Sequence, residues 1–253
     1  MTEGKKIIIE VPLSFADMHA WAKLIQEVRY ENRFFLSDIS SRFVDGLMKY
    51  AKKFKIHTYE SGERFYRARV HDFQMEEQNF PKQEMGPPPK YKATHGRLNP
   101  VGIPYMYLAN DLDTAISEVR PWIGCKITVS EFLLQGSIAV VNFSKIVFTN
   151  VPTEQDYVAH ETTWRELITW MFSAPFDPRD DTAYTPTQYL AERIKKEGFD
   201  GILYDSALNK GGYNLTLFDN GKTTPGKLFD VEVRAISYQH SVKEILDGGN
   251  SKS

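Results

Sequence analysis

One short stretch of the chain, residues 96–119 (GRLNPVGIPYMYLANDLDTAISEV), concentrates residue types that could hold a diphosphate and stabilise a sugar cation. It contains Arg97, two glycines that expose backbone amides (Gly96 and Gly102) and one glutamate, Glu118. An arginine can hold phosphate oxygens through charge-assisted, paired hydrogen bonds. A carboxylate can stabilise the positive charge that develops on a sugar ring as its bond to a leaving group breaks. Chemistry on a phosphorylated sugar compound is therefore the first hypothesis.

Two more arginines come from the segment 64–70, where residue types alternate. Alternation with a period of two predicts a strand, with Tyr66, Ala68 and Val70 on one face and Phe65, Arg67 and Arg69 on the other. Arg67 and Arg69 should thus project from the same face. Arginines that merely cover the edge of a sheet would give the same pattern.

Glu118 lies on a predicted helix whose buried stripe consists of Leu112, Ala115, Ile116 and Val119. Helical geometry puts Glu118 at the margin of this stripe, so we expect it to be half buried. The residues three and four positions away include no cation that would pair with it as on an ordinary surface helix. A solvated carboxylate with a distant partner is the alternative to a catalytic group.

Five segments together resemble the RES domain, a family named for its arginine, glutamate and serine. They are FYRAR (65–69), GRLNPVGIPYMYLA (96–109), TAISEV (114–119), GFDGILYDS (198–206) and GGYNLTLF (211–218). The resemblance extends from about Tyr59 to Tyr238 and leaves the amino-terminal segment outside. It implies an α+β fold similar to that of ADP-ribosyltransferase toxins, with a mixed sheet and flanking helices.

The resemblance also implies an activity, the breakdown of NAD at the bond between nicotinamide and ribose. Phosphorolysis would make the protein an NAD phosphorylase with inorganic phosphate as co-substrate, and hydrolysis would make it an NAD glycohydrolase. NAD is then the substrate, and no cofactor is required. RES proteins are often toxins that pair with a separate antitoxin protein.

Residue by residue, the resemblance assigns catalytic roles to Arg67, Glu118 and Ser206, and NAD-binding roles to Arg97 and Tyr107. Arg67 and Arg97 would hold the diphosphate, Tyr107 would face the nicotinamide or its ribose, Glu118 would stabilise the oxocarbenium ion, and Ser206 would position the ribose or a phosphate. Further candidates for NAD binding are Arg69, Asn99 and Asn214. Ordinary explanations remain for several of them: Tyr107 as a core aromatic residue, and Ser206, Asn99 and Asn214 as turn residues.

Two other functions use the same residues. Transfer of ADP-ribose to a protein would use the same pocket, with loops such as residues 72–94 contacting the acceptor. A non-catalytic module that binds NAD or a partner protein is the other alternative. No G-x-G-x-x-G turn is present, which argues against a Rossmann oxidoreductase.

Composition excludes several classes of function. The net charge of −2 over 253 residues gives no basic footprint for nucleic acid. No segment has the length and apolarity of a membrane span, and the amino terminus lacks a signal-peptide pattern, so we expect a cytoplasmic protein. The single cysteine, Cys125, allows no internal disulfide, and the six histidines lack metal-ligand spacing. The oligomeric state stays open.

The elements that must position these residues follow from periodicity and turn signals. Residues 1–58 are expected to form a helical appendage, residues 59–240 the RES domain, and residues 241–253 a disordered tail. Besides the segment 64–70, we predict strands at 104–109, 126–134, 137–143 and 228–238 and within GILYDS and NLTLFD, and helices at 112–120 and 154–171. Another helix should begin at TPTQ, with Thr185 as its N-cap and Gln188 closing a capping box, and end before Gly198.

Overall fold

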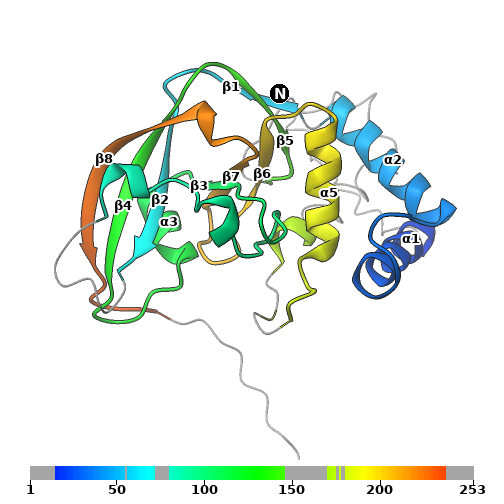
Figure 1. The fold of residues 1–253 in the computed structure, drawn as a ribbon, viewed down its shortest axis with the longest axis horizontal. Helices are drawn as coiled ribbons and strands as arrows, with labels where there is room; N and C mark the ends of the chain where they lie inside the picture. The colour runs from blue at the N-terminus through cyan, green and yellow to red at the C-terminus, as the bar shows by residue number, and fades with distance from the viewer. Residues whose placement is uncertain are drawn as a thin grey trace, which may run out of the picture.

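The computed structural model describes residues 15–54, 56–71, 80–145, 170–174, 177 and 180–237. These residues form an α+β fold in which helices flank an eight-stranded mixed sheet of order β1-β5-β6-β7-β3-β2-β4-β8 (Figure 1). The predicted fold class, a mixed sheet with flanking helices and an amino-terminal helical segment, is confirmed. Only β5 and β6 pair in parallel in this sheet.

The strands agree with the predicted ones to within a few residues, with two exceptions. Their bounds are β1 Ile56–Tyr59, β2 Arg64–Val70, β3 Met106–Ala109, β4 Lys126–Leu134, β5 Ile138–Asn142, β6 Gly201–Asp205, β7 Tyr213–Leu217 and β8 Thr223–Glu232. Strand β1 was not predicted, and β8 begins and ends earlier than the predicted strand 228–238. Strand β8 is an edge strand in which every residue is at least partly exposed, and it contains Pro225 and Gly226, which weaken a strand signal in the sequence.

The helices comprise four α-helices and several shorter elements within the described residues. They are α1 Phe15–Gln26, the π-helix η1 Glu27–Glu31, α2 Asp38–Phe54, α3 Leu112–Glu118 and α5 Thr185–Lys196, with 3₁₀ turns η2 Lys82–Glu84, η3 Lys90–Lys92 and η5 Asn220–Lys222. The helix predicted for 154–171 lies outside the described residues except for its end, where residues 170–173 are helical. The predicted tail, 241–253, also lies outside them.

The amino-terminal helices pack into the same hydrophobic core as α5 and the neighbouring strands β5 and β6. Leu24 of α1 and Leu47 of α2 are fully buried in one cluster with Ile194 of α5 and Ile202 of β6. In Figure 1, α1 and α2 lie beside α5, at the end of the sheet away from β8. The domain boundary at residue 58 stays a prediction, but the helices before it share the core of the fold with the elements that follow.

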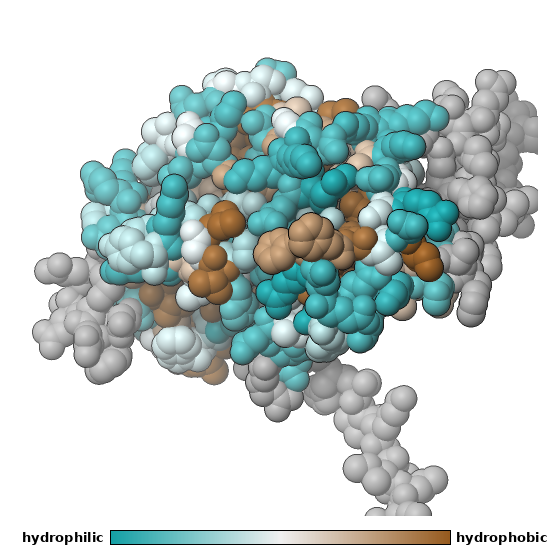
Figure 2. All heavy atoms as spheres, turned by 45° about the vertical axis from the view of Figure 1, so that its right-hand side comes forward, coloured by the Kyte–Doolittle hydropathy of each residue, from teal (hydrophilic) through white to brown (hydrophobic). Residues whose placement is uncertain are grey.

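The outer surface is mostly hydrophilic on the face that carries these helices. In Figure 2, apolar side chains form small groups separated by hydrophilic ones. No helix among the described residues is long and apolar enough to cross a membrane.

Candidate active site

A pocket of about 280 Å³ opens where β2 and β3 meet helix α3. Its lining comes from five elements: Tyr66, Arg67 and Ala68 of β2, Tyr107, Leu108 and Ala109 of β3, Ala115 and Glu118 of α3 with Val119 after it, Tyr204 of β6 and Asn214 of β7. Ligand pockets usually measure about 300–1,000 Å³, so this one could enclose only part of a dinucleotide. Both polar and aromatic side chains face it.

The Arg67 side chain extends from β2 and bonds the backbone of β3 at the pocket. The described register between these two strands is a single pair, Tyr66 with Ala109, whereas β2 pairs with β4 along its whole length. Beyond that pair, the Arg67 Nη1 donates to the Tyr107 carbonyl at 3.0 Å and links the strands. Because the pocket reaches this opened edge of β2, it is lined by residues from both faces of the strand, Tyr66 and Ala68 as well as Arg67.

The Arg67 side chain is half-buried, and its guanidinium is incompletely hydrogen-bonded. Its Nε has no partner among the described residues. Burial, together with the nearby charge of Arg69, lowers the pKa of Arg67 to about 10, so the side chain is still protonated at neutral pH. A cation with a buried, unpaired N–H donor is a strong binding site for an anion.

Glu118 stands at the carboxyl end of α3, and one of its oxygens is fixed by two strands. Oε1 accepts from Ser206 Oγ at 2.7 Å and from Asn214 Nδ2 at 2.7 Å. Both donors are neutral, so they orient the carboxylate without cancelling its charge. The prediction that Glu118 is half buried is wrong: the residue is exposed, because it lies in the last turn of a seven-residue helix.

Ser206 is held in place by the turn that follows β6. Its Oγ accepts from the amides of Leu208 and Asn209 at 3.1 and 3.0 Å while it donates to Glu118. The Asn209 side chain in turn donates to Thr114 Oγ1 on α3 at 2.9 Å. The turn and the helix therefore fix both partners of the Ser206–Glu118 bond, and Ser206 acts as a turn residue and a site residue at once.

Tyr107 is one of the residues that line the pocket, and its hydroxyl is bonded to the loop before β3. The hydroxyl donates to Asn99 Oδ1 at 2.8 Å and accepts from the Leu98 amide at 3.0 Å. Burial raises the pKa of Tyr107, so the phenol stays neutral. Asn99 is itself buried and donates to the carbonyls of Thr94 and Pro100, so it braces this loop and does not line the pocket.

Gly96 is required by this arrangement. A Cβ at position 96 would lie 2.5 Å from Asn99 Oδ1 and 2.9 Å from the Tyr107 hydroxyl oxygen, both closer than real Cβ contacts allow. The expectation that Gly96 exposes its backbone amide is wrong: the amide donates to the Asn99 carbonyl at 2.9 Å. Glycine is needed here because the bond between Tyr107 and Asn99 leaves no room for a side chain.

Side chains in the first turn of α5 donate hydrogen bonds to the backbone of the same loop. Gln188 Nε2 donates to the carbonyls of Gly96 and Asn99 at 2.8 and 3.0 Å, and Thr187 Oγ1 donates to the Arg97 carbonyl at 2.5 Å. The capping box predicted at TPTQ is wrong: the N-cap is Tyr184, without a side-chain capping bond. Gln188 reaches tertiary partners in place of the backbone of its own helix.

Arg97 and Arg69 lie beside the pocket without lining it. The Arg97 guanidinium donates to the Ala174 carbonyl at 2.9 Å and faces the ring of Tyr184, 5.5 Å from its centroid. Arg69 donates to the Glu84 carbonyl and packs over the ring of Phe80 at 5.0 Å. The two candidates are therefore engaged with segments that do not line the pocket.

Of the sequence candidates, the structure brings Arg67, Tyr107, Glu118 and Asn214 to one pocket and attaches Ser206 to it through Glu118. It adds Tyr204, which the sequence analysis missed. Burial and the charge of Glu118 raise the pKa of Tyr204, and the charge of Arg97 acts in the opposite direction. Tyr204 precedes Ser206 by two positions, so strand alternation could have placed both on one face.

The candidate site holds no metal-ligand cluster in the parts of the chain that the structure describes: no three histidine, cysteine, aspartate or glutamate side chains gather there or elsewhere in those parts. The charged groups at the pocket are one arginine and one carboxylate, supported by hydroxyl and amide donors. Such a set can bind an anionic ligand and stabilise a developing cation.

The sequence model of the RES domain matches residues 64–237, which include every element that lines the pocket. The chain belongs to the RES domain family. The match begins after β1, so the amino-terminal helices lie outside the RES domain as the model defines it.

This RES domain protein was also compared with curated protein sequences and with solved structures. A search among curated protein sequences found no match. Among solved structures, a chain from the crystal structure of the M. tuberculosis MbcT-MbcA toxin-antitoxin complex aligns with 74% of this chain and 93% of its own length, at 16% identity and a TM-score of 0.41. At this low identity and TM-score, the alignment does not identify any residue of the candidate site.

Proposed function

We propose that this RES domain protein cleaves NAD at the bond between nicotinamide and ribose, as an NAD phosphorylase or an NAD glycohydrolase. One observation carries the proposal: a carboxylate held by two neutral donors, Ser206 and Asn214, stands at a pocket that is also lined by the cation Arg67. The site thus offers a negative charge for a sugar cation and a positive charge for phosphate oxygens. Membership of a family that breaks down NAD supports the same conclusion.

The pocket volume suits the nicotinamide end of the substrate. We place the nicotinamide ribose between Glu118 and the ring of Tyr107, with Arg67 donating to a phosphate oxygen. The charges of Glu118 and Arg97 both act on Tyr204, so Arg97 lies near the same tyrosine. The remainder of the dinucleotide would extend past Tyr204 towards Arg97.

In the proposed reaction the C1–N bond of the ribose breaks and its electron pair leaves with nicotinamide, which becomes a neutral pyridine and needs no acid. Positive charge develops on the ribose, and the Glu118 carboxylate stabilises it. An oxygen of inorganic phosphate or water then forms the new bond to C1. Phosphate gives ADP-ribose-1″-phosphate, whereas water loses a proton and gives ADP-ribose.

The test compares the purified protein with its Glu118→Gln variant in NAD, with and without inorganic phosphate, and resolves the products by chromatography. Release of nicotinamide that depends on phosphate and is lost in the variant supports a phosphorylase, and ADP-ribose in both buffers supports a glycohydrolase. Intact NAD in both buffers overturns the proposal. An ADP-ribosylated product on an added protein, detected as a mass shift of that protein, would favour the transferase instead.

We also propose that the protein is the toxin of a toxin–antitoxin pair, on the strength of its family. Expression in a bacterial host should then lower cellular NAD and arrest growth, and the Glu118→Gln variant should do neither. Normal growth with unchanged NAD during expression of active protein would contradict this role.

A further inference from the structure

Arg29, on the π-helix η1, ties the amino-terminal helices to the turn that precedes α5. Its Nη2 lies 2.6 Å from Asp180 Oδ2, and its Nε and Nη2 donate to Thr182 Oγ1 at 3.0 and 2.9 Å. Thr182 is further bonded to Asp180 through its own hydroxyl and amide. One guanidinium therefore holds two adjacent acceptors, the geometry for which arginine is suited and lysine is not.

The turn held by Arg29 leads into α5 and, through Tyr184, contacts Arg97 in the loop before β3. The Thr182 carbonyl accepts from the Thr185 amide at 3.0 Å at the start of α5, and Tyr184, between them, presents its ring to the Arg97 guanidinium. The next residues of α5 hold the backbone of the same loop, since Thr187 bonds the Arg97 carbonyl. A short chain of contacts thus runs from Arg29 to Arg97.

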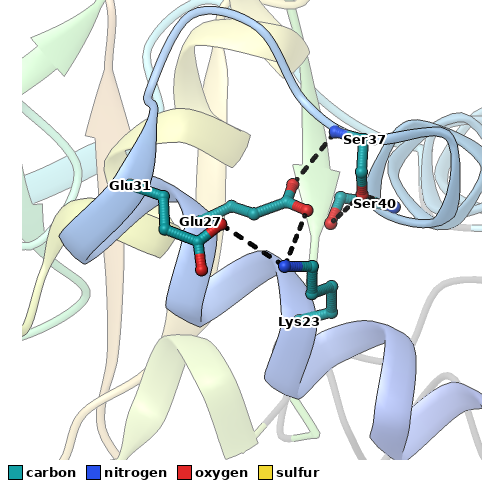
Figure 3. A network of polar contacts seen from close by, with 5 residues as sticks. All are labelled: Lys23, Glu27, Glu31, Ser37 and Ser40. Carbon is teal, nitrogen blue, oxygen red and sulfur yellow. Dashed lines mark hydrogen bonds and ion pairs between the residues drawn. The ribbon is translucent and has the colours of Figure 1, made fainter.

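Helix η1, from which Arg29 extends, is itself fixed by a second set of contacts made by Glu27. Glu27, buried with 4% of its surface exposed, accepts from the Ser37 amide at 3.1 Å and pairs with Lys23 at 3.5 Å (Figure 3). Lys23 also reaches Glu31 at 3.3 Å, at the end of the same short helix. Helix η1 is therefore held against α1 and the start of α2, so Arg29 extends from an anchored support.

We propose that Arg29 is a positioning residue for the NAD site, acting through the turn at Asp180–Thr182 on Tyr184 and Arg97. This role rests on the proposed function for its effect on NAD, and it gives the amino-terminal helices a part in the reaction although they lie outside the RES match, residues 64–237. The described contacts of Arg29 are with Asp180, Thr182 and Tyr30, none of which lines the pocket, so its effect is on the orientation of the loop that carries Arg97.

The chain offers a matched control. Arg193, in the last turn of α5, donates to Asp45 Oδ1 of α2 at 3.0 Å and so joins the same two parts of the molecule at the other end of α5. Arg29→Ala and Arg193→Ala each remove one such link. Only the first removes a contact to the turn that carries Tyr184.

The experiment measures steady-state kinetics with NAD for the wild type, Arg29→Ala, Arg29→Lys and Arg193→Ala. We expect Arg29→Ala to raise KM about tenfold, with kcat changed by less than about threefold because the reacting groups stay in place. Arg29→Lys should recover only part of the loss, and Arg193→Ala should keep the wild-type KM even where its melting temperature falls equally. Equal KM values for both alanine variants would overturn the proposal.

A second measurement does not depend on activity. Amide hydrogen exchange should quicken in the segment from Gly96 to Asn99 in Arg29→Ala and stay unchanged there in Arg193→Ala. If the wild-type protein consumes no NAD, the proposed function fails, and this comparison still decides whether Arg29 orders the loop. Unchanged exchange in both variants would mean that Arg29 stabilises the fold without positioning Arg97.

Discussion

The Ser206 hydroxyl lies 2.7 Å from Glu118 Oε1, although 88 positions separate the two residues. The serine and the glutamate that the sequence analysis matched to the family name are therefore direct partners in this protein, and Asn214 also donates to Glu118 from the strand next to β6. The contact assigns a physical task to Ser206: it holds one carboxylate oxygen and leaves the other available to a ligand.

Removal of the Ser206 hydroxyl should impair catalysis through the orientation of Glu118. We expect Ser206→Ala to lower kcat/KM about tenfold, corresponding to the loss of one hydrogen bond to a charged group. Glu118→Gln, which removes the charge itself, should lower it about 100-fold or more. Asp113→Asn, on the same helix, is the control and should retain wild-type kinetics, measured by nicotinamide release. An active Glu118→Gln enzyme would refute the role of the carboxylate.

Replacement of Arg67 should separate stability from activity. A cation whose Nε is buried without a partner is costly without an anion, so Arg67→Met should raise the free energy of unfolding by about 1–3 kcal/mol and abolish NAD cleavage. Inorganic pyrophosphate should raise the melting temperature of the wild type, because it binds the folded state, and have no such effect on the variant. Differential scanning fluorimetry measures both effects. Loss of stability in a correctly folded Arg67→Met protein would contradict the account.

Position 96 should tolerate no side chain. Gly96→Ala must displace Asn99 Oδ1 or the Tyr107 hydroxyl, and overpacking of this kind costs about 1–3 kcal/mol. The shifted loop should also weaken NAD binding, seen as a higher KM. Gly86→Ala is the matched control, because a Cβ there meets nothing within 4 Å and should change neither chemical denaturation nor KM. Equal behaviour of the two variants would show that the loop adapts.

Glu27 should make stability dependent on pH in the acid range. Burial alone would raise its pKa, but hydrogen bonds from Ser37 and Ser40 and the charge of Lys23 outweigh this and lower it below 4.5. A lowered pKa means that the ionised form stabilises the fold above about pH 4.5 and that this contribution is lost as the pH falls through the folded-state value.

The variant Glu27→Gln isolates this contribution. At neutral pH we expect it to lower the free energy of unfolding by about 1 kcal/mol, and the difference from the wild type should shrink below about pH 4.5. Urea titrations at several pH values measure it. The control is Glu31→Gln, whose carboxylate also contacts Lys23 but is 46% exposed. A difference that grows on acidification would reverse the predicted sign.

Much of this site could be predicted from the sequence because its residues lie in local patterns. Alternation along residues 64–70 identified the strand of Arg67, and the apolar stripe of residues 112–119 identified the helix of Glu118. The exposure of Glu118 could not be predicted in this way, since it depends on where a seven-residue helix ends. The same holds for Gln188, whose local capping signal was overridden by two carbonyls more than 85 positions away.

By itself, the sequence determined the family, the α+β class and the identity of the charged residues, because these depend on residue type and short-range periodicity. Only the tertiary structure decided which of them meet. It placed Glu118 with Ser206 and Asn214, opened β2 from β3 at Arg67, and directed Arg97 towards Tyr184. Such contacts join residues far apart in the chain, and they are fixed by strand order and by competition among hydrogen-bond partners, which no local pattern encodes.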